Sequence, residues 1–315
     1  MKPLVVQTEH LDSECAAWLS ERCELARCAP DDGAFPGLLA RAQGLLVRTY
    51  TTVDDAMLAA APSLKVVARA GVGLDNIDLT ACAKRGVTVV HTPDANSDAV
   101  VEFVFAAMLD AWRPRMMLDK ALDPPTWKSL RAEMTARRQL HGSTLGVYGM
   151  GRIGRRVARV GEALGMQVLY HDLLEVPMER RHGARPVTRE ALLRESEILT
   201  VHVDERPANR GLLGVDAFAK CRDDVLFINA ARGFIVDAVS LAAFLREHPD
   251  ATAIIDVHEP EPFGPDYPLL GVPNAVLSPH LAAATATAQR NMSWVVQDLW
   301  RVLQGEAPKH PAPVR

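Results

Sequence analysis

The length and composition of the chain are those of an ordinary globular protein. It has 315 residues, of which 48% are hydrophobic and 23% charged, and a chain of this length has room for about two domains. This mixture excludes an intrinsically disordered protein. The formal net charge of −4 gives no general attraction to nucleic acid or to an anionic membrane, so we expect neither as a partner. No apolar run approaches the roughly 18 residues of a membrane span, and the first residues turn polar too early for a secretory signal.

The cysteines indicate the compartment. There are five, an odd number, and they are scattered without a CxxC pair. We therefore expect neither a disulfide framework nor a metal site. Unpaired cysteines of this kind fit the reducing cytoplasm.

Short apolar runs alternate with helical patterns along the whole chain. Runs rich in Val and Leu are typical of strands buried on both faces of a parallel sheet. In the first part of the chain they lie at 4–8, 45–49, 65–70 and 87–91, with helical patterns at 11–21, 53–60 and 78–85. The second series lies at 144–149, 166–172, 197–203, 224–230, 251–257 and 274–280. This alternation predicts an α/β protein with one doubly wound parallel sheet in each half.

Two longer helices are predicted between and after these series. The first covers 98–112 and is apolar on most faces, so it should be buried. The second covers 285–304, with Gly305 as its C-terminal cap. The tail that follows contains three prolines and is expected to be an extended strap.

A glycine-rich turn is the most informative motif. Gly149, Gly151 and Gly154 form a GxGxxG pattern that follows a predicted strand and opens a predicted helix. Gly149 would permit the tight turn, Gly151 would let backbone amides approach a pyrophosphate, and Gly154 would let the helix pack against the sheet. The helix N-terminus would attract the phosphates. The motif predicts a dinucleotide site.

The nature of the dinucleotide follows from the next predicted strand. Asp172 ends that strand 21 positions after Gly151, near the spacing of an acid that binds the adenosine ribose. Its charge would repel a 2′-phosphate, and Leu173 and Leu174 follow it instead of an arginine. We therefore predict NAD rather than NADP.

Four further segments lead to a family resemblance. They are 68–78 (ARAGVGLDNID), 228–237 (INAARGFIVD), 256–262 (DVHEPEP) and 277–281 (LSPHL). Together with the position of the glycine turn, they make residues 44–305 resemble the D-isomer-specific 2-hydroxyacid dehydrogenases. Within that family the chain is most similar to the catalytic cores of phosphoglycerate dehydrogenases and glyoxylate/hydroxypyruvate reductases. The resemblance implies a Rossmann NAD-binding domain, 98–285, inserted into a flavodoxin-like substrate domain made of 1–97 and 286–315. It also implies a homodimer formed through the cofactor domain.

The resemblance further implies three catalytic residues. Arg232 would bind the substrate carboxylate, because a guanidinium matches a carboxylate with two parallel hydrogen bonds. His280 would act as the acid/base, since an imidazole titrates near neutral pH. Glu261 would hydrogen-bond the other ring nitrogen and favour the imidazolium. Glu259 is the other candidate for this last role. The family motif Asp-Val-x-x-x-Glu-Pro has its glutamate five residues after the aspartate, and counting from Asp256 this is Glu261.

The same resemblance implies the rest of the site. The cofactor-binding residues would be Val72, Gly149, Gly151, Arg152, Ile153, Gly154, Asp172, His202, Val203, Ala230 and Asp256. The substrate-binding residues would be Arg48, Thr49, Gly71, Val72 and Gly73, together with Arg232. Asn96 and Glu102 match the family's interdomain segment and are interpreted as hinge or capping residues.

Some residues depart from the family pattern. Asp204–Arg206 stand where Pro-Leu is usual, which puts contacts on the adenosine side in doubt. His258 replaces a common aromatic residue, and we expect it to narrow or polarise the site. Thr51 and Thr52 stand where phosphoglycerate-type sequences often have a lysine nearby, which weakens the case for a phosphorylated substrate.

The leading hypothesis is an enzyme that transfers a hydride between NAD(H) and a small D-2-hydroxy acid or its 2-oxo form. The alternative is an NAD(H)-sensing binding protein that resembles the family's corepressors and has little turnover. A different Rossmann enzyme, such as a sugar-nucleotide epimerase, is disfavoured by the late glycine turn and the lack of a Tyr-x-x-x-Lys pair.

Overall fold

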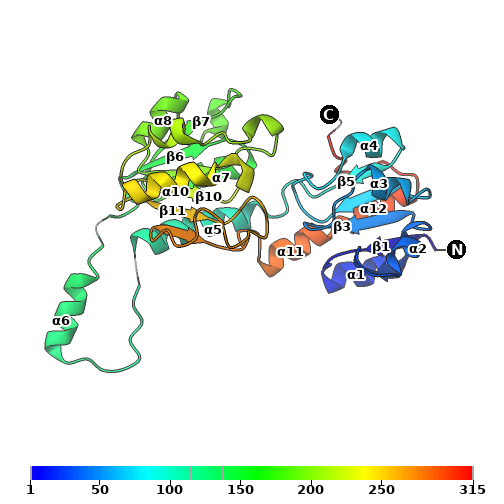
Figure 1. Ribbon diagram of the computed structural model, residues 1–315, viewed down its shortest axis with the longest axis horizontal. Coiled ribbons are helices and arrows are strands. Elements are labelled where there is room, and N and C mark those ends of the chain that lie inside the picture. Colours follow the sequence, from blue (N-terminus) through cyan, green and yellow to red (C-terminus); the bar gives the residue numbers. More distant parts are fainter. Residues whose placement is uncertain (1, 114, 137, 314–315) are drawn as a thin grey trace. The chain divides into compact units, whose positions relative to one another are not determined.

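Each of the two series of apolar runs forms its own sheet in the computed structural model, which describes residues 2–113, 115–136 and 138–313. The chain divides into two compact units, Met1–Asn96 with Ala283–Arg315, and Ser97–Ala282. The first is blue, cyan and orange-red in Figure 1, and the second is mainly green and yellow. We describe each unit by itself.

The first unit contains a five-stranded parallel sheet in the order β2-β1-β3-β4-β5. Its strands are β1 (Leu4–Gln7), β2 (Glu24–Arg27), β3 (Gly44–Val47), β4 (Val66–Arg69) and β5 (Thr88–Val90). Its helices are α1 (Ser13–Ser20), α2 (Phe35–Leu39), α3 (Asp55–Ala59), α4 (Leu79–Lys84), α11 (Ala286–Ser293) and α12 (Val296–Leu303). This strand order is the flavodoxin-like one, and its switch point lies between β1 and β3.

The second unit contains a seven-stranded parallel sheet in the order β12-β11-β10-β9-β6-β7-β8. The strands are β6 (Thr144–Tyr148), β7 (Gln167–His171), β8 (Arg185–Pro186), β9 (Ile198–Val201), β10 (Leu226–Asn229), β11 (Thr252–Ile255) and β12 (Ala275–Leu277). The helices are α5 (Ser97–Trp112), α6 (Pro124–Glu133), α7 (Arg152–Ala163), α8 (Arg189–Glu195), α9 (Val215–Phe218) and α10 (Ala238–Glu247), with short 3₁₀ turns η1 (Met178–Arg180), η2 (Pro207–Asn209) and η3 (Gly233–Ile235). This is the Rossmann order with an added edge strand, so the prediction of two doubly wound parallel sheets is confirmed.

The burial of the central strands explains why they could be predicted. Every residue of β3, β9 and β10 is buried, because helices cover both faces of each sheet. By contrast, β2 and β8 were not predicted. They are edge strands with exposed charged residues, so neither resembles a buried apolar run.

The predicted helix at 285–304 is wrong in one respect, because the structure has two helices there. The N–H groups of Val295 and Gln297 donate to carbonyls three residues back instead of four, which ends α11 and restarts the helix as α12. The indole of Trp294 lies at this break and packs edge-on against Trp18, with 6.2 Å between ring centroids. The side chain of Trp294 therefore contributes to the core at the position where the helix bends.

The tail after Gly305 is the expected strap. Gly305 has φ +78° just after α12, as a C-terminal cap requires. The buried carboxylate of Asp298 accepts the backbone N–H groups of Lys309 and His310, both at 2.8 Å. Pro311 then forms an antiparallel bridge with Val90, which covers the edge of the first sheet. Over 2–113, 115–136 and 138–313, the structure has no helix with the length and hydropathy needed to cross a membrane.

Candidate active site

The three predicted catalytic residues follow three neighbouring strands of the second sheet. Arg232 follows β10, Glu261 follows β11 and His280 follows β12, and these strands pair in that order. Because the strands are parallel, their carboxyl ends meet at one edge of the sheet, where ligands bind in this architecture. All three side chains are partly accessible there.

The loop that carries Arg232 is held by a buried amide. Asn229 is completely buried; its Nδ2 donates to the carbonyl of Arg232 at 3.0 Å, and its Oδ1 accepts the N–H of Ala231 at 3.1 Å. The guanidinium of Arg232 donates to the carbonyl of Ala231 at 2.8 Å. The side chain of Asn229 therefore fixes the turn from which the guanidinium extends.

Glu261 and His280 form a direct pair. The Nδ1 of His280 lies 2.8 Å from the Oε2 of Glu261. The other carboxylate oxygen accepts the N–H of His258 at 2.7 Å. Glu259, the competing candidate, instead forms an ion pair with Arg210 at 3.1 Å.

The charge on Glu261 follows from these contacts. Burial alone would raise the pKa of this carboxyl, but the hydrogen bonds from His280 and from the N–H of His258 outweigh it and hold the pKa below its usual range. An ionised carboxylate can only accept, so Nδ1 of His280 carries the proton of this bond. Nε2 is then the nitrogen that can exchange a proton with a substrate.

Asp256 anchors the loop that presents His280. Its fully buried carboxylate accepts the hydroxyl of Ser278 at 2.5 Å and the N–H groups of Leu281 and Ala282 at 2.7 and 2.8 Å. Its carbonyl accepts the N–H of His280 at 2.8 Å. These bonds hold His280 at φ +56°, a left-handed conformation that is unfavourable for a residue with a Cβ. Asp256 was predicted among the cofactor-binding residues, and in the structure its carboxylate is bonded to the segment that contains His280.

The glycine turn lies at the switch point between β6 and β9. A Cβ added to Gly149, which has φ +95°, would lie 2.7 Å from the carbonyl of His202, and one added to Gly154 would lie 2.0 Å from the carbonyl oxygen of Gly149. Neither position therefore tolerates a side chain. At Gly151, in contrast, an added Cβ would meet no described atom within 4 Å. Gly151 is the N-cap of α7 and makes no side-chain capping bond, so the helix presents its N-terminus to open space.

Two side chains beside the turn complete the cradle. The carboxylate of Asp172 accepts the N–H groups of Met150 at 2.6 Å and Leu174 at 2.9 Å. Nδ1 of His202 is inaccessible to solvent and finds no hydrogen-bond partner within the described part of the chain. Burial lowers the pKa of His202 to about 3, so this ring is neutral near pH 7. An open helix N-terminus, an acid after β7 and an unpaired ring nitrogen together fit a dinucleotide.

The remaining cofactor predictions of this unit lie around the cradle. Arg152 and Ile153 are the first residues of α7, Val203 follows β9 and Ala230 follows β10. The unusual loop at Asp204–Arg206 adds a guanidinium that was not predicted. Arg206 forms two 2.7 Å bonds with Asp204, which raise its pKa, and the nearby charge of Asp172 adds to the effect.

Apart from Arg232, the predicted substrate-binding residues lie in the first unit, on loops after β3 and β4. A residue that the sequence reasoning missed holds the first of these loops: the carboxylate of Glu9 accepts the N–H groups of Arg48, Thr49, Tyr50 and Thr51 at 2.9–3.1 Å. Desolvation would raise the pKa of Glu9, but these four bonds lower it below its usual value. Glu9 follows β1, next to the switch point of the sheet, and that position was the signal available in the sequence.

The second substrate loop is held by residues at the end of β5. Nδ1 of His91 lies 2.9 Å from the carbonyl oxygen of Val72, and the N–H of Thr92 donates to Gly71 at 3.0 Å. The two loops are joined by Asn76, whose Nδ2 donates to the carbonyls of Arg48 at 3.1 Å and Thr51 at 2.7 Å. The first unit therefore brings together the loops that carry Arg48, Thr49, Val72 and the two flanking glycines, Gly71 and Gly73.

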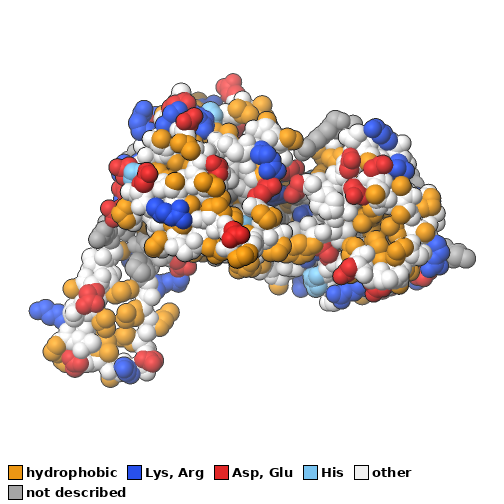
Figure 2. Space-filling view, viewed as in Figure 1, with side chains coloured by type: hydrophobic (Ala, Val, Ile, Leu, Met, Phe, Trp, Pro, Cys, Tyr) orange, Lys and Arg blue, Asp and Glu red, His pale blue; other side chains and the backbone are white. Residues whose placement is uncertain are grey.

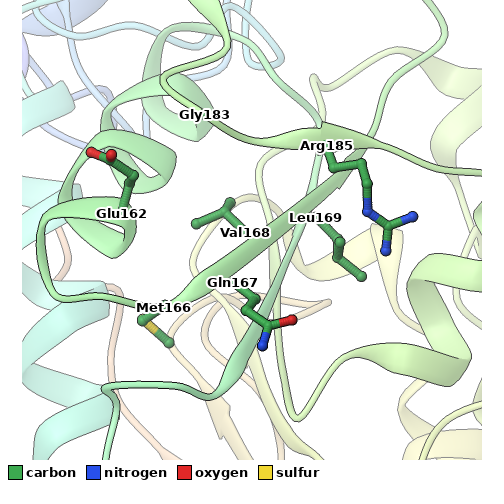
Figure 3. A pocket seen from close by; sticks show the side chains of 7 residues that line it. All are labelled: Glu162, Met166, Gln167, Val168, Leu169, Gly183 and Arg185. Carbon is green, nitrogen blue, oxygen red and sulfur yellow. The ribbon is translucent and has the colours of Figure 1, made fainter.

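A small cavity of about 210 Å³ lies elsewhere in the second unit (Figure 3). It is lined by Glu162, Met166, Gln167, Val168, Leu169, Gly183 and Arg185. These residues surround the amino end of β7, whereas Asp172 follows its carboxyl end. The cavity is therefore distinct from the candidate active site.

Comparison with known proteins adds to this geometry. Residues 105–282 match the NAD binding domain of the D-isomer specific 2-hydroxyacid dehydrogenases. The chain is 38% identical over 266 residues to the D-3-phosphoglycerate dehydrogenase of Archaeoglobus fulgidus, an alignment that covers 84% of this chain and 50% of that protein. It is 37% identical over 262 residues to the glyoxylate reductase of Aeropyrum pernix, covering 81% of this chain and 78% of that protein.

A solved structure is similar to this chain over almost its whole length. The D-lactate dehydrogenase of Aquifex aeolicus, complexed with NAD and lactic acid, has a TM-score of 0.81 with 25% identity, and the alignment covers 96% of each chain. The present chain spans about half the length of the phosphoglycerate dehydrogenases to which it is similar.

Proposed function

Because this chain belongs to the D-isomer specific 2-hydroxyacid dehydrogenase family, we propose that it is an NAD-dependent oxidoreductase that acts on a small D-2-hydroxy acid or its 2-oxo form. The observation that carries the proposal is the 2.8 Å contact between Glu261 and His280, beside the loop of Arg232 and in the unit that contains the glycine turn. An ionised carboxylate next to an imidazole, with a guanidinium on the neighbouring strand, is the set of groups that proton transfer to a 2-oxo acid requires.

NAD, when bound, would accept the hydride in oxidation, and NADH would donate it in reduction. Backbone amides at Gly149–Gly154 would hold the pyrophosphate, and Asp172 would accept the ribose hydroxyls. His202 would direct its unpaired Nδ1 to the cofactor. The other predicted contacts are Val72, Arg152, Ile153, Val203 and Ala230.

The chemical roles follow from the geometry of the three loops. Arg232 binds the substrate carboxylate and polarises the carbonyl. Nε2 of His280 donates a proton to the forming alkoxide during reduction and removes it during oxidation. Glu261 stabilises the imidazolium and fixes the tautomer. Asp256 acts as a positioning residue, because its carboxylate is engaged by the loop that carries His280.

We propose that the loops after β3 and β4 hold the substrate, through Arg48, Thr49, Gly71, Val72 and Gly73. A small, unphosphorylated acid is the class that fits best. Thr51 stands in the segment where a phosphate-binding lysine would be expected nearby; it is buried and its hydroxyl bonds Thr8 at 2.7 Å. The loop therefore directs this side chain into the protein and not toward a phosphate.

We also propose that the protein is a cytoplasmic homodimer. None of residues 124–133 in α6 is buried, and Trp127 is half exposed. Met116, Met117 and Leu118 precede it with exposures of 48–87%, and Figure 2 shows apolar side chains gathered over this segment. A second copy of the chain would cover these side chains. The five cysteines are all free in the structure, which supports a reducing compartment.

The experiment that tests the proposed activity is a substrate panel followed by NADH absorbance. We expect oxidation of NADH on addition of glyoxylate, hydroxypyruvate or 2-oxobutyrate, and loss of this turnover in His280→Asn. The competing hypothesis is a corepressor-like NAD(H) sensor. NADH binding without turnover of any acid, in wild type and His280→Asn alike, would overturn the enzyme proposal in favour of that alternative.

A further inference from the structure

We propose that His258 is a positioning residue that ties together the three loops carrying Arg232, Glu261 and His280. This inference rests on the function proposed above and concerns the same site. The sequence suggested that His258 narrows or polarises the site. The structure instead buries the residue, at 7% exposure, and its ring contacts the protein on both nitrogens.

The backbone of His258 contacts the first two loops. A Cβ added to Gly233, the neighbour of Arg232, would lie 2.0 Å from the carbonyl of His258, so only a glycine lets these two loops pack so closely. The N–H of His258 donates to Oε1 of Glu261 at 2.7 Å. These contacts belong to the main chain, and a substitution at position 258 would leave their donors and acceptors in place.

The imidazole of His258 contacts the third loop. Its Nε2 lies 2.9 Å from the carbonyl oxygen of Ser278, two residues before His280. A carbonyl oxygen can only accept, so Nε2 carries the proton. Nδ1, 3.2 Å from the phenol oxygen of Tyr267, is then the acceptor. Burial, with the charge of Glu261, raises the pKa of Tyr267 to about 12, which keeps this phenol protonated as a donor.

Aromatic packing holds the ring in this orientation. The imidazole of His258 lies edge-on to Phe263 and Tyr267, with centroid separations of 4.6 and 5.3 Å. Phe263 and Tyr267 stack on each other at 4.6 Å. A phenylalanine at position 258 could occupy this space, but it could not donate to Ser278. The packing and the hydrogen bond can therefore be separated by substitution.

The bond to Ser278 bears on the catalytic pair. The hydroxyl of Ser278 donates to Asp256, and its carbonyl accepts from His258, so the residue is held on both sides. Loss of the imidazole bond frees one side of the loop that places His280 against Glu261. Small displacements of a catalytic group cost much of its rate enhancement.

The test compares two variants of position 258. His258→Phe keeps an aromatic ring and removes the donor, while His258→Gln places an amide N–H near the position of Nε2 and removes the ring. We expect kcat/KM for the 2-oxo acid to fall about tenfold in His258→Phe, because one hydrogen bond to the loop is lost. His258→Gln should recover most of this loss. Binding of NADH, followed by fluorescence, should stay within about twofold of wild type in both variants, because the ring contacts Phe263, Tyr267 and Ser278, none of which is a predicted cofactor residue.

The pH profile supplies a readout that packing alone would not change. The ionisable groups that face the ring of His258 are Glu261 and Tyr267 on its own loop, with Asp256 and His280 joined to it through Ser278. Weakening the Glu261–His280 contact disfavours the imidazolium, so the high-pH limb of the reduction rate should move to lower pH in His258→Phe and return in His258→Gln.

Two results would overturn the proposal. One is that His258→Phe has the same kcat/KM and the same pH profile as the wild type. The other is an equal loss of activity in both variants with an unchanged pH profile and a lowered thermal midpoint, which would assign His258 to stability alone. If wild type turns over no acid, the proposed activity fails, but the positioning role can still be tested. The NMR chemical shifts of the His280 ring, which report its 2.8 Å contact with Glu261, should then differ between wild type and His258→Phe, and identical chemical shifts would refute the role.

Discussion

The N–H of His280 donates to the carbonyl of Asp256 at 2.8 Å, while the carboxylate of Asp256 accepts the N–H groups of the two residues that follow His280. His280 is held in a left-handed backbone conformation, at φ +56°, by this arrangement. One buried acid therefore compensates for the strain at the residue that we assign to proton transfer.

Asp256→Asn tests this relationship. The new amide nitrogen cannot accept an N–H group, so at least one buried backbone donor loses its partner. An unmet buried polar group costs about 1–3 kcal/mol, which corresponds to a fall of roughly 2–12 °C in the thermal midpoint of a unit of this size. We expect kcat to fall about tenfold or more, because His280 is no longer held in place. Asp266→Asn, at an exposed carboxylate after β11, is the matched control and should leave both unchanged. A wild-type kcat in Asp256→Asn would contradict the anchoring role.

Glu261→Gln tests the charge on the catalytic pair. A neutral amide cannot favour the imidazolium, so the reduction rate should fall about 10- to 100-fold, and its high-pH limb should shift to lower pH. The measurement is kcat for NADH oxidation across pH. Glu259→Gln serves as the control, because Glu259 pairs with Arg210 and not with His280. If the two variants behave alike, Glu261 does not have the role assigned to it.

Substitutions at two glycines distinguish an effect on the fold from an effect on cofactor binding. In Gly154→Ala the new methyl would lie 2.0 Å from a backbone oxygen, so we expect a loss of both thermal stability and NADH affinity. In Gly151→Ala no described atom lies within 4 Å of the added carbon, so the fold should persist. The methyl would nevertheless occupy the space assigned to the pyrophosphate, and NADH affinity should fall about tenfold or more. Unchanged NADH affinity in Gly151→Ala would show that the pyrophosphate does not bind at this turn.

Asp172 should make the protein select NAD. Its carboxylate would repel the 2′-phosphate of NADP, so we expect kcat/KM to be at least about tenfold higher with NADH than with NADPH. Asp172→Ala should narrow this ratio, and the nearby guanidinium of Arg206 would then favour the phosphate. A preference of the wild type for NADPH would refute the assignment.

Glu9 gives a pH dependence to the substrate loop of the first unit. Its pKa is lowered in the folded protein, so its contribution to stability is complete above the ordinary value of 4.5 and is lost as pH falls through the depressed folded value. Below that value the carboxyl is protonated and holds the N–H groups of 48–51 less strongly. Glu9→Gln should imitate this state at neutral pH by raising KM for the acid several-fold. Glu24→Gln, on the exposed face of β2, should have no effect on KM. An unaltered KM in Glu9→Gln would show that the loop does not depend on this carboxylate.

Much of the fold could be predicted from local patterns. The buried parallel strands are continuous apolar runs, so all ten predicted strands are present, and the glycine turn lies between β6 and α7 as expected. The edge strands β2 and β8 and the exposed helix α6 could not be predicted in this way, because they bury too little apolar surface to leave a periodic signal.

The supporting residues of the site were harder to predict for a different reason. The contact between Glu261 and His280 could be expected from a family motif, but the bonds of Glu9 and Asp256 join segments far apart in the chain. Such bonds depend on which strand ends become neighbours. His258 shows the same limit: its sequence position suggested a ligand-facing ring, and only the contacts with Ser278 and Tyr267 place that ring inside the protein.

The proposed reaction requires Arg232 and His280 to act on the same substrate molecule. The most direct measurement is a crystal structure of the protein with NADH and oxamate, an unreactive analogue of a 2-oxo acid. We predict that the guanidinium of Arg232 and Nε2 of His280 both lie within about 3.2 Å of oxamate oxygens, with Glu261 still bonded to Nδ1. Oxamate bound beside the nicotinamide but out of reach of His280 or Arg232 would refute the roles proposed for these two residues.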